Sequence, residues 1–184
     1  LFLANRNGKY IESPQAAFME DVLSEDTDAL FFDADGDGDL DLFVTSGSNE
    51  AAFGTAELAD RLYLNNGKGN FTKAENNGLG SLRHSTSVVK ALDVNGDGAM
   101  DLFIGGRLIP FVYGVNASSF ILVNDGQGNF KDATSEFAPQ MKEIGLVTDA
   151  ALVDYDGDGK DDLILVGEWM APTFFKNTGK QLEK

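Results

Sequence analysis

Residues 33–41 read Asp33-Ala34-Asp35-Gly36-Asp37-Gly38-Asp39-Leu40-Asp41, and the same pattern returns twice along the chain. The second and third copies read Asp93-Val94-Asn95-Gly96-Asp97-Gly98-Ala99-Met100-Asp101 and Asp154-Tyr155-Asp156-Gly157-Asp158-Gly159-Lys160-Asp161-Asp162. We call them Asp loops 1, 2 and 3 and number each from its first aspartate. Oxygen-bearing side chains then fall at positions 1, 3, 5 and 9, with glycine at positions 4 and 6. One loop design is therefore used three times.

This spacing of oxygens predicts a site for a hard cation in each loop. Ca²⁺ takes about six to eight oxygen ligands at flexible geometry, and a coiled loop can turn alternate residues onto one point. Without a cation the carboxylates repel one another, and loop 1 contains no basic residue to neutralise them. Position 7 varies, so we expect it to contribute its backbone carbonyl. The predicted ligands of three Ca²⁺ ions are Asp33, Asp35, Asp37, Asp39, Asp41; Asp93, Asn95, Asp97, Ala99, Asp101; Asp154, Asp156, Asp158, Lys160 and Asp162.

Plain surface turns, EF-hands and thrombospondin-like arrays fit these loops less well. Asp and Gly are common in surface turns, but three copies in the same phase argue against turns without a ligand. An EF-hand needs a bidentate Glu at position 12, where this chain has Val44, Ile104 and Leu165, and a following helix, where this chain has strand-like apolar runs. A thrombospondin-like calcium array needs cysteines, and the chain has none.

Charge and composition limit the partners. The formal charge is −16, which argues against nucleic acid because phosphate binding needs clustered Lys and Arg. The chain contains no run of 18 apolar residues, so the sequence predicts no membrane-spanning helix. Extracellular calcium modules bind at roughly 10⁻⁴ to 10⁻³ M, and we expect this range, with tighter binding at the more acidic loops 1 and 3. Such sites fill where calcium is plentiful, which favours an extracellular, cell-surface or periplasmic location.

A second repeated element is a hairpin pattern, in which apolar runs flank an Asn/Asp/Gly turn. It occurs at residues 62–71, 121–130 and 174–180, and a fourth copy occupies residues 1–10. Each Asp loop is flanked by two further strand-like runs, so every unit has four strands, A to D, arranged as two hairpins. In the first full unit we expect strands at about residues 28–33, 41–46, 61–65 and 70–74. Four antiparallel strands per repeat predict a β-propeller blade.

The units resemble FG-GAP/VCBS repeats, the blades of the integrin-α-type β-propeller. This resemblance implies calcium binding in the loops between strands A and B. The segments 105–107 and 166–170 also resemble, more weakly, repeat proteins of the ASPIC/UnbV type. Two departures stand out: Asn95 replaces the usual Asp at position 3, and Asp161 occupies the normally apolar position 8.

We therefore predict an all-β fold, a β-propeller segment of three four-stranded antiparallel blades plus an outer half-blade. Residues 1–184 form a single segment, divided into a half-blade with its connection (1–27) and blades at 28–85, 86–146 and 147–184. Propellers have about four to eight blades, so we expect the rest of a longer propeller upstream, downstream or in a second chain. The chain begins without Met and already in a strand-like pattern, which favours a piece of a longer protein.

The antiparallel order predicts two distinct faces. The Asp loops and the C–D turns share one face, whereas the B–C loops and the D–A connections share the other. Varied loops on a rigid scaffold are common binding sites, so a protein or glycan ligand is expected on the face opposite the calcium loops. The residues expected to contact it are His84, Arg107, Tyr113 and Trp169. The alternative is that these side chains fill gaps between blades, above all Trp169 and Phe111. One imidazole without companions is a poor transition-metal site.

The predicted function is a calcium-binding interaction or adhesion module of a secreted or cell-surface protein. Two alternatives stay open: the propeller domain of a glycan-processing enzyme, or a purely structural scaffold. A glycosidase needs two facing carboxylates, and Glu57 and Glu168 are the candidates on that face. The chain has one His, no Cys and no Gly-x-Ser-x-Gly motif, so we expect no enzyme activity.

Overall fold

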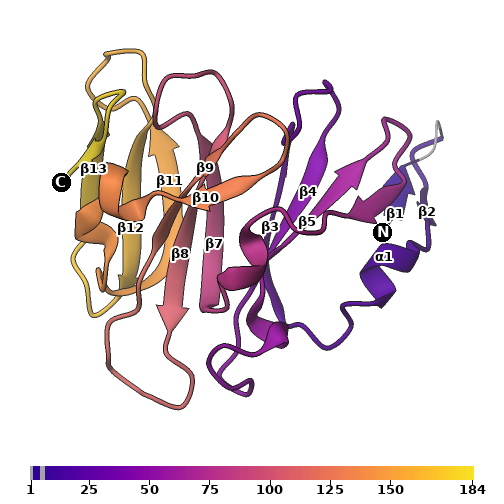
Figure 1. The fold of residues 1–184 in the computed structure, drawn as a ribbon, viewed down its shortest axis with the longest axis horizontal. Coiled ribbons are helices and arrows are strands. Elements are labelled where there is room, and N and C mark those ends of the chain that lie inside the picture. Colours follow the sequence, from indigo (N-terminus) through magenta and orange to yellow (C-terminus); the bar gives the residue numbers. More distant parts are fainter. Residues whose placement is uncertain (1, 5–6) are drawn as a thin grey trace.

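The computed structural model describes residues 2–4 and 7–184, which form three four-stranded antiparallel sheets side by side (Figure 1). We call the sheets blades 1, 2 and 3. In each blade the strands follow one another in chain order. Blade 1 contains β3 (Asp26–Phe32), β4 (Asp41–Ser46), β5 (Arg61–Asn65) and β6 (Phe71–Lys73); blade 2 contains β7 (Ser85–Leu92), β8 (Asp101–Leu108), β9 (Phe120–Asn124) and β10 (Phe130–Asp132); blade 3 contains β11 (Leu146–Val153), β12 (Asp162–Glu168), β13 (Thr173–Asn177) and β14 (Leu182–Glu183). This arrangement confirms the predicted all-β propeller segment.

The predicted half-blade is a two-stranded antiparallel hairpin, in which β1 (Phe2–Ala4) pairs with β2 (Tyr10–Glu12). Leu1, Asn5 and Arg6, which the sequence assigned to this hairpin, lie outside the described residues. Helices are short and lie in connections: α1 (Ala16–Met19), η1 (Ala56–Leu58), η2 (Leu79–Ser81), α2 (Thr134–Phe137) and η3 (Pro139–Met141). The first strands of the blades begin one or two residues before the unit boundaries drawn from the sequence.

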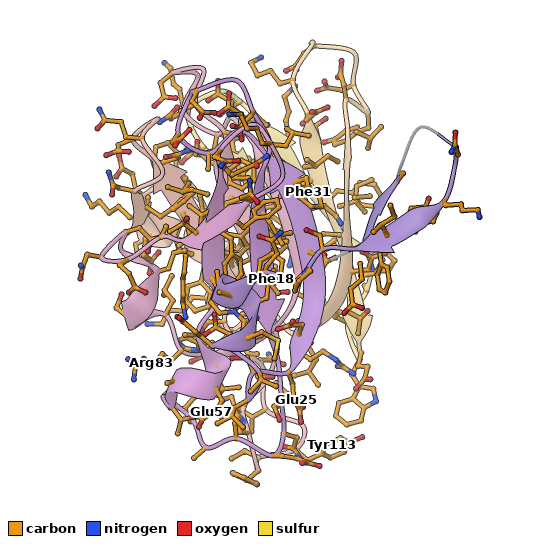
Figure 2. The ribbon with its side chains drawn as sticks, turned by 90° about the vertical axis from the view of Figure 1, so that its right-hand side faces the viewer. Phe18, Glu25, Phe31, Glu57, Arg83 and Tyr113 are labelled. Carbon is orange, nitrogen blue, oxygen red and sulfur yellow. The ribbon has the colours of Figure 1, made fainter. Side chains whose placement is uncertain are left out.

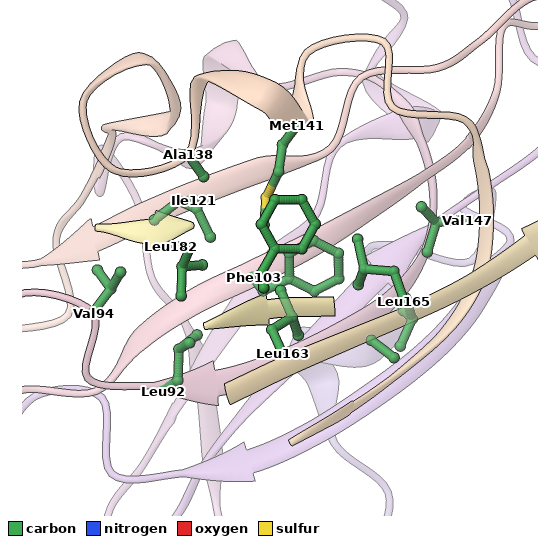
Figure 3. Packing of buried hydrophobic residues seen from close by; sticks show 13 residues of the cluster. Leu92, Val94, Phe103, Ile121, Ala138, Met141, Val147, Leu163, Leu165 and Leu182 are labelled. Atoms are coloured by element: carbon green, nitrogen blue, oxygen red, sulfur yellow. The ribbon is translucent and has the colours of Figure 1, made fainter. Parts of the chain in front are cut away.

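The middle blade is covered on both faces, as its nearly continuous apolar strands require. Along β8, Leu102 and Ile104 pack with Phe43 of blade 1 in one buried cluster. Phe103, between them in sequence, packs with Phe175 of blade 3 in a second cluster, which Figure 3 shows. Full burial of each such side chain contributes roughly 1.5–3 kcal/mol, so the two clusters hold the blades together.

The outer faces of the segment are less well covered. The two chain termini lie at opposite ends of the row of blades, and the sheets do not close into a ring (Figure 1). On blade 1, Leu42, Val44 and Tyr63 are covered in part by Phe18 of α1, whose ring lies 4.9 Å from that of Tyr63 (Figure 2). On blade 3, the large side chain of Phe174 is half exposed.

Strand direction sorts the connections onto two faces, as predicted. The three Asp loops lie at the upper edge in Figure 1. The loops after β4, β8 and β12 (residues 47–60, 109–119 and 169–172) and the connections 74–84 and 133–145 form what we call the opposite face. Within residues 2–4 and 7–184, no helix has the length and apolarity to cross a membrane.

Candidate metal centres and the opposite face

The aspartate at position 1 coils each Asp loop. In loop 1, Asp33 Oδ1 accepts the Gly36 N–H at 2.8 Å, and Oδ2 accepts the Gly38 N–H at 3.1 Å. Both glycines have positive φ, 78° and 90°, which glycine adopts without the Cβ penalty. Asp93 and Asp154 accept the equivalent amides in loops 2 and 3 at 2.7–3.0 Å. The three loops therefore share one backbone conformation.

In loop 1, the aspartates at positions 3 and 5 each accept one backbone amide and keep a second oxygen available. In loop 1, Asp35 Oδ1 accepts the Asp37 N–H, and Asp37 Oδ1 accepts the Asp39 N–H. Oxygens of Asp33, Asp35 and Asp37 lie within 4.8 Å of one another. The same grouping occurs in loop 3 for Asp154, Asp156 and Asp158. These clusters are all-oxygen donor sets, the kind that Ca²⁺ prefers.

The side chain at position 7 adds an acceptor in loop 1. Asp39 Oδ1 is buried and has no hydrogen-bond partner among the described residues. Burial and the neighbouring charges of Asp37, Asp35 and Asp33 raise the pKa of Asp39. A buried oxygen without a partner, beside three carboxylates, matches the needs of a bound cation. The residues of loop 1 therefore fit calcium.

Loop 2 is built the same way but is less acidic. Asn95 Oδ1 accepts the Asp97 N–H at 2.9 Å, as the aspartates at position 3 do in the other loops. Its Nδ2 donates to Asp97 Oδ2 at 2.8 Å. The Asn95 amide therefore occupies the second oxygen of Asp97, whereas the equivalent oxygen of Asp37 in loop 1 stays available.

Position 9 has a different role from positions 1, 3 and 5. Asp101 is fully buried, and its two oxygens accept the Val94 N–H at 3.0 Å and the Asn124 N–H at 2.8 Å. Burial raises the pKa of Asp101 to about 6, although both N–H groups oppose this. Asp41 and Asp162 make the equivalent pairs of bonds. Position 9 ties each loop to the third strand of its blade, and its role as a calcium ligand stays a prediction.

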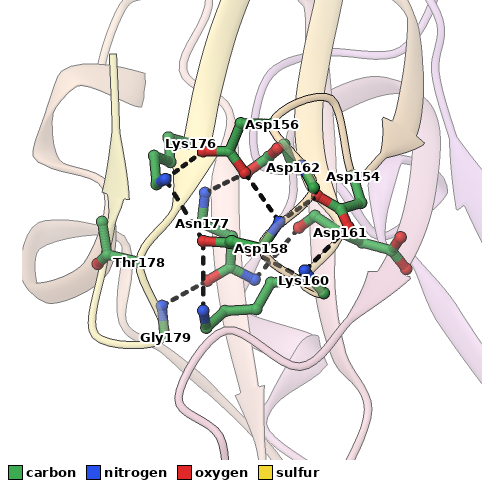
Figure 4. Close-up of polar contacts among 12 residues, drawn as sticks. Asp154, Asp156, Asp158, Lys160, Asp161, Asp162, Lys176, Asn177, Thr178 and Gly179 are labelled. Atoms are coloured by element: carbon green, nitrogen blue, oxygen red, sulfur yellow. Dashed lines mark hydrogen bonds and ion pairs between the residues drawn. The ribbon is translucent and has the colours of Figure 1, made fainter.

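Two lysines offset part of the negative charge of loop 3 (Figure 4). Lys176 Nζ forms an ion pair with Asp156 and lies 3.4 Å from Asp158 Oδ2, while Lys160 Nζ lies 3.3 Å from the same oxygen. Burial opposes ionisation of Asp158, but hydrogen bonds from the Lys160 backbone and from both lysines lower its pKa. The hydrogen bond to Asp156 raises the pKa of Lys176. The loop pattern predicts only a carbonyl role for Lys160 and contains no signal for Lys176, which lies outside the loop in β13.

On the opposite face, the structure brings three of the four predicted contact residues together. The rings of Tyr113 and Trp169 meet edge to face, with centroids 5.0 Å apart. Arg107 Nη2 donates to Glu168 Oε1 at 2.7 Å, joining blades 2 and 3 and lowering the pKa of Glu168. Beside them is a cavity of about 400 Å³. It is lined by Asn49, Arg107, Leu108, Phe111, Val112, Tyr113, Gly114, Leu146 and Glu168.

Phe111 and Trp169 are exposed and have unusual backbones. Phe111 follows Pro110 in a turn closed by the Val112 N–H and the Ile109 carbonyl at 3.0 Å, and its φ is 63°. Trp169 has φ 54°. Phe111, Trp169 and Tyr113 are 68%, 70% and 83% exposed, and Figure 2 shows Tyr113 at the lower end of the molecule. Phe111 and Trp169 therefore fill no gap among the three described blades.

His84 and Glu57 lie apart from this cavity. The His84 ring lies 5.0 Å from Phe53 and 4.7 Å from Phe120, and burial lowers its pKa. Glu57 lines a separate cavity of about 400 Å³ together with Glu25 and Glu50. The two carboxylates considered for a glycosidase, Glu57 and Glu168, therefore line different cavities.

Asp loops 1 and 2 lie within a match to a known protein family. The family model described as an FG-GAP-like repeat matches residues 33–104, from the start of Asp loop 1 into β8. No curated protein matches the sequence. The match covers loops 1 and 2 and leaves the ASPIC/UnbV-type resemblance a prediction. Residues 33–104 of this chain thus match an FG-GAP-like repeat, as the loop pattern and the blade architecture predict.

Proposed function

We propose that this chain is a calcium-stabilised interaction module of a secreted or cell-surface protein, with calcium in a structural role. The observation that carries the proposal is the donor set of loop 1, in which the carboxylates of Asp33, Asp35 and Asp37 converge and Asp39 of the same loop has an unpartnered buried oxygen. When bound, calcium supplies the positive charge that balances these carboxylates. The residues that would hold it are Asp33, Asp35, Asp37 and Asp39. Asp41 ties the loop to β5 by accepting the Ala34 and Asn65 N–H groups.

A fixed conformation of loop 1 also matters for the contact between blades 1 and 2. A Cβ added to Gly36 of loop 1 would lie 3.3 Å from the Gly126 carbonyl of blade 2, so the two turns abut. Asn124 Nδ2 of blade 2 donates to the Ala34 carbonyl of loop 1 at 2.9 Å. A cation that fixes loop 1 therefore also fixes the surface on which blade 2 packs.

The affinities are expected to differ among the loops. Loop 1 has five aspartates and no ammonium partner among the described residues, so it should bind calcium most tightly. In loop 3, calcium has to displace Lys176 and Lys160 from the carboxylates. This reverses the expectation that loop 3, as an acidic loop, binds more tightly than loop 2.

Partner binding, without catalysis, is proposed for the opposite face. A general acid needs a raised pKa to hold its proton near neutral pH. Arg107 lowers the pKa of Glu168, and the neighbouring Thr55 side chain lowers the pKa of Glu57. Their separate cavities also oppose a pairing across one sugar. These properties favour a binding module over a glycosidase.

A further blade is proposed to pack on the outer face of blade 3. Phe174 and Val153 are exposed there, at the repeat positions where blade 2 has Ile121 and Leu92 fully buried against blade 3. We expect a longer chain that adds one FG-GAP-like unit after residue 184 to bury Phe174 and to unfold at a higher temperature. A longer chain with Phe174 still exposed would contradict this packing.

The test of the calcium role is thermal unfolding with a chelator and with calcium. At about 10 mM Ca²⁺ and the expected affinities, each filled site adds roughly 1.4–2.7 kcal/mol of stability by mass action. The melting temperature should rise by several degrees, and Asp37→Ala should lose part of the rise. The control is Asp161→Ala, which removes an exposed carboxylate of loop 3 that is not among the predicted ligands. Identical melting with chelator and calcium would reject the proposal.

A further inference from the structure

The cavity beside Arg107 is built from all three blades. Asn49 follows β4 of blade 1, Arg107 and Tyr113 belong to blade 2 and its loop, and Glu168 ends β12 of blade 3. Two contacts fix it: the Arg107–Glu168 ion pair, and the Phe111 N–H, which donates to Asn49 Oδ1 at 2.9 Å. The loops therefore form a preorganised cavity of about 400 Å³, a size typical of small-ligand sites.

The polar groups of this cavity match the hydroxyl groups of a polyol. Arg107 uses Nη2 on Glu168 Oε1, which leaves Nε, Nη1 and the second carboxylate oxygen without a hydrogen bond among the described residues. Asn49 uses its oxygen on Phe111 and keeps its amide N–H groups. Donors and acceptors thus stand side by side, and a sugar hydroxyl both donates and accepts.

The rim of the cavity supplies aromatic surfaces. Phe111 and Tyr113 line it, and the Trp169 ring meets the Tyr113 ring. All three rings are mostly exposed. Aromatic faces carry negative charge density, so the C–H face of a sugar ring can stack on them. Positive φ at bulky Phe111 and Trp169 is a strained conformation, and such strain clusters at binding sites.

Charge selects among ligand classes. The guanidinium of Arg107 is already balanced by Glu168, so an anionic ligand finds no unpaired cation there. The chain as a whole carries −16, which repels anions further. A protein partner needs about 800 Å² of contact per side, which this small concave site does not supply by itself. We infer that the cavity binds a neutral carbohydrate, with a sugar ring on the aromatic rim and its hydroxyls on Arg107, Glu168 and Asn49. This inference rests on the proposed function, because it names the ligand of the opposite face.

The chain's single tryptophan is Trp169, and its contact with the Tyr113 ring makes its fluorescence a probe of this site. The test is a fluorescence titration of the full 184-residue chain, at saturating calcium, with neutral xylo-, manno-, gluco- and galacto-oligosaccharides. At least one series should give a saturable change in Trp169 emission. Tyr113→Ala and Glu168→Gln should each weaken that binding about tenfold or more, since loss of one good contact costs about this factor. Tyr10→Ala, which removes an exposed ring from β2, is the matched control and should stay within about twofold.

The outcomes separate this inference from the proposed function. Unchanged Trp169 emission with all four neutral series, or binding that survives Tyr113→Ala in a variant with wild-type melting, would overturn the carbohydrate inference. Binding of sulfated or uronate oligosaccharides alone would also overturn it. A purified protein ligand whose binding Tyr113→Ala abolishes would overturn it while supporting the interaction module. Sugar binding together with calcium-independent melting would support the inference and reject the calcium role.

Discussion

Aspartates that look alike in the sequence have distinct roles in the structure. Asp93 at position 1 coils its loop by accepting two glycine amides, whereas Asp101 at position 9 is buried and ties the loop to β9. The carboxylates at positions 3 and 5 of loop 1 keep one oxygen each away from backbone amides. The spacing predicted that all of them would gather at one point. Burial and the reach of each side chain separate them into groups.

Lys176 tests how the charge of loop 3 is balanced. Lys176→Gln removes the ammonium that pairs with Asp156 and Asp158, so calcium no longer has to displace it. The calcium affinity of loop 3 should rise about two- to fivefold, the range that partly exposed ion pairs allow. Isothermal titration calorimetry measures it, with Lys180→Gln, at an exposed lysine of the same hairpin, as the control. An unchanged or weaker third site would contradict this balance of charge.

Asp60 predicts a dependence of stability on pH that is independent of calcium. Asp60 Oδ1 accepts the Ser46 N–H and the Thr86 hydroxyl, both at 2.8 Å, and burial raises the pKa of Asp60 to about 7. The folded state therefore holds this proton more tightly than the unfolded state, whose pKa is near 3.8. The stability that Asp60 contributes is complete below about pH 4 and is lost as the pH rises through about 7.

Asp60→Asn removes this ionisation. Relative to the parent, the variant should gain free energy of unfolding between pH 4 and pH 8, with a ceiling of about 4 kcal/mol for roughly three pKa units. Urea unfolding in chelator at several pH values measures the difference, with the exposed Glu25→Gln as the control. A difference that is constant across this pH range would show that Asp60 ionises alike in both states.

At the level of strands and turns, an amide side chain links neighbouring blades. Asn124 ends β9, and its Nδ2 donates to the Met100 carbonyl of its own blade at 3.2 Å and to Ala34 of blade 1 at 2.9 Å. Asn177 makes the equivalent bonds to Asp161 and to Asp93 of blade 2. The hairpin repeat in the sequence predicted the turns, but it did not predict this link.

Asn124→Ala should leave one buried and one partly buried carbonyl, those of Ala34 and Met100, without this donor. The expected loss is about 1–3 kcal/mol of unfolding free energy. Asn65→Ala is the matched control, because Asn65 occupies the same repeat position and donates only to the Leu40 carbonyl among the described residues. It should cost about 1 kcal/mol less. Denaturant unfolding measures both variants, and equal losses would mean that the bond between blades adds nothing.

The strands were predictable where apolar patterning determines them. β4 and β5 have the predicted bounds, because apolar runs end at an Asp loop or at a turn. β3 begins two residues earlier than expected. Asp26 and Thr27 are polar, and Asp26 pairs with Ser46 across a register shift before Asp28. The apolar pattern contains no signal for such a bulge, so the first strand was drawn too short.

For the whole molecule, the repeat in the sequence predicted the repeat in space. Three Asp loops gave three blades, and the fourth hairpin gave the half-blade. The contact of Phe18 with the outer face of blade 1 was not predicted, because α1 lies in a connection, outside the repeated loop and hairpin patterns. The sequence predicted a ligand-binding face but not the cavity at Arg107, because the shape of the cavity depends on how the loops of three blades meet.

The most direct test of the calcium role is the number of Ca²⁺ ions bound per chain. Equilibrium dialysis at millimolar calcium should find up to three ions, with loop 1 filled first. Asp37→Ala should lose one ion and Asp161→Ala none. A chain that binds no calcium under these conditions, while folded, would contradict the account.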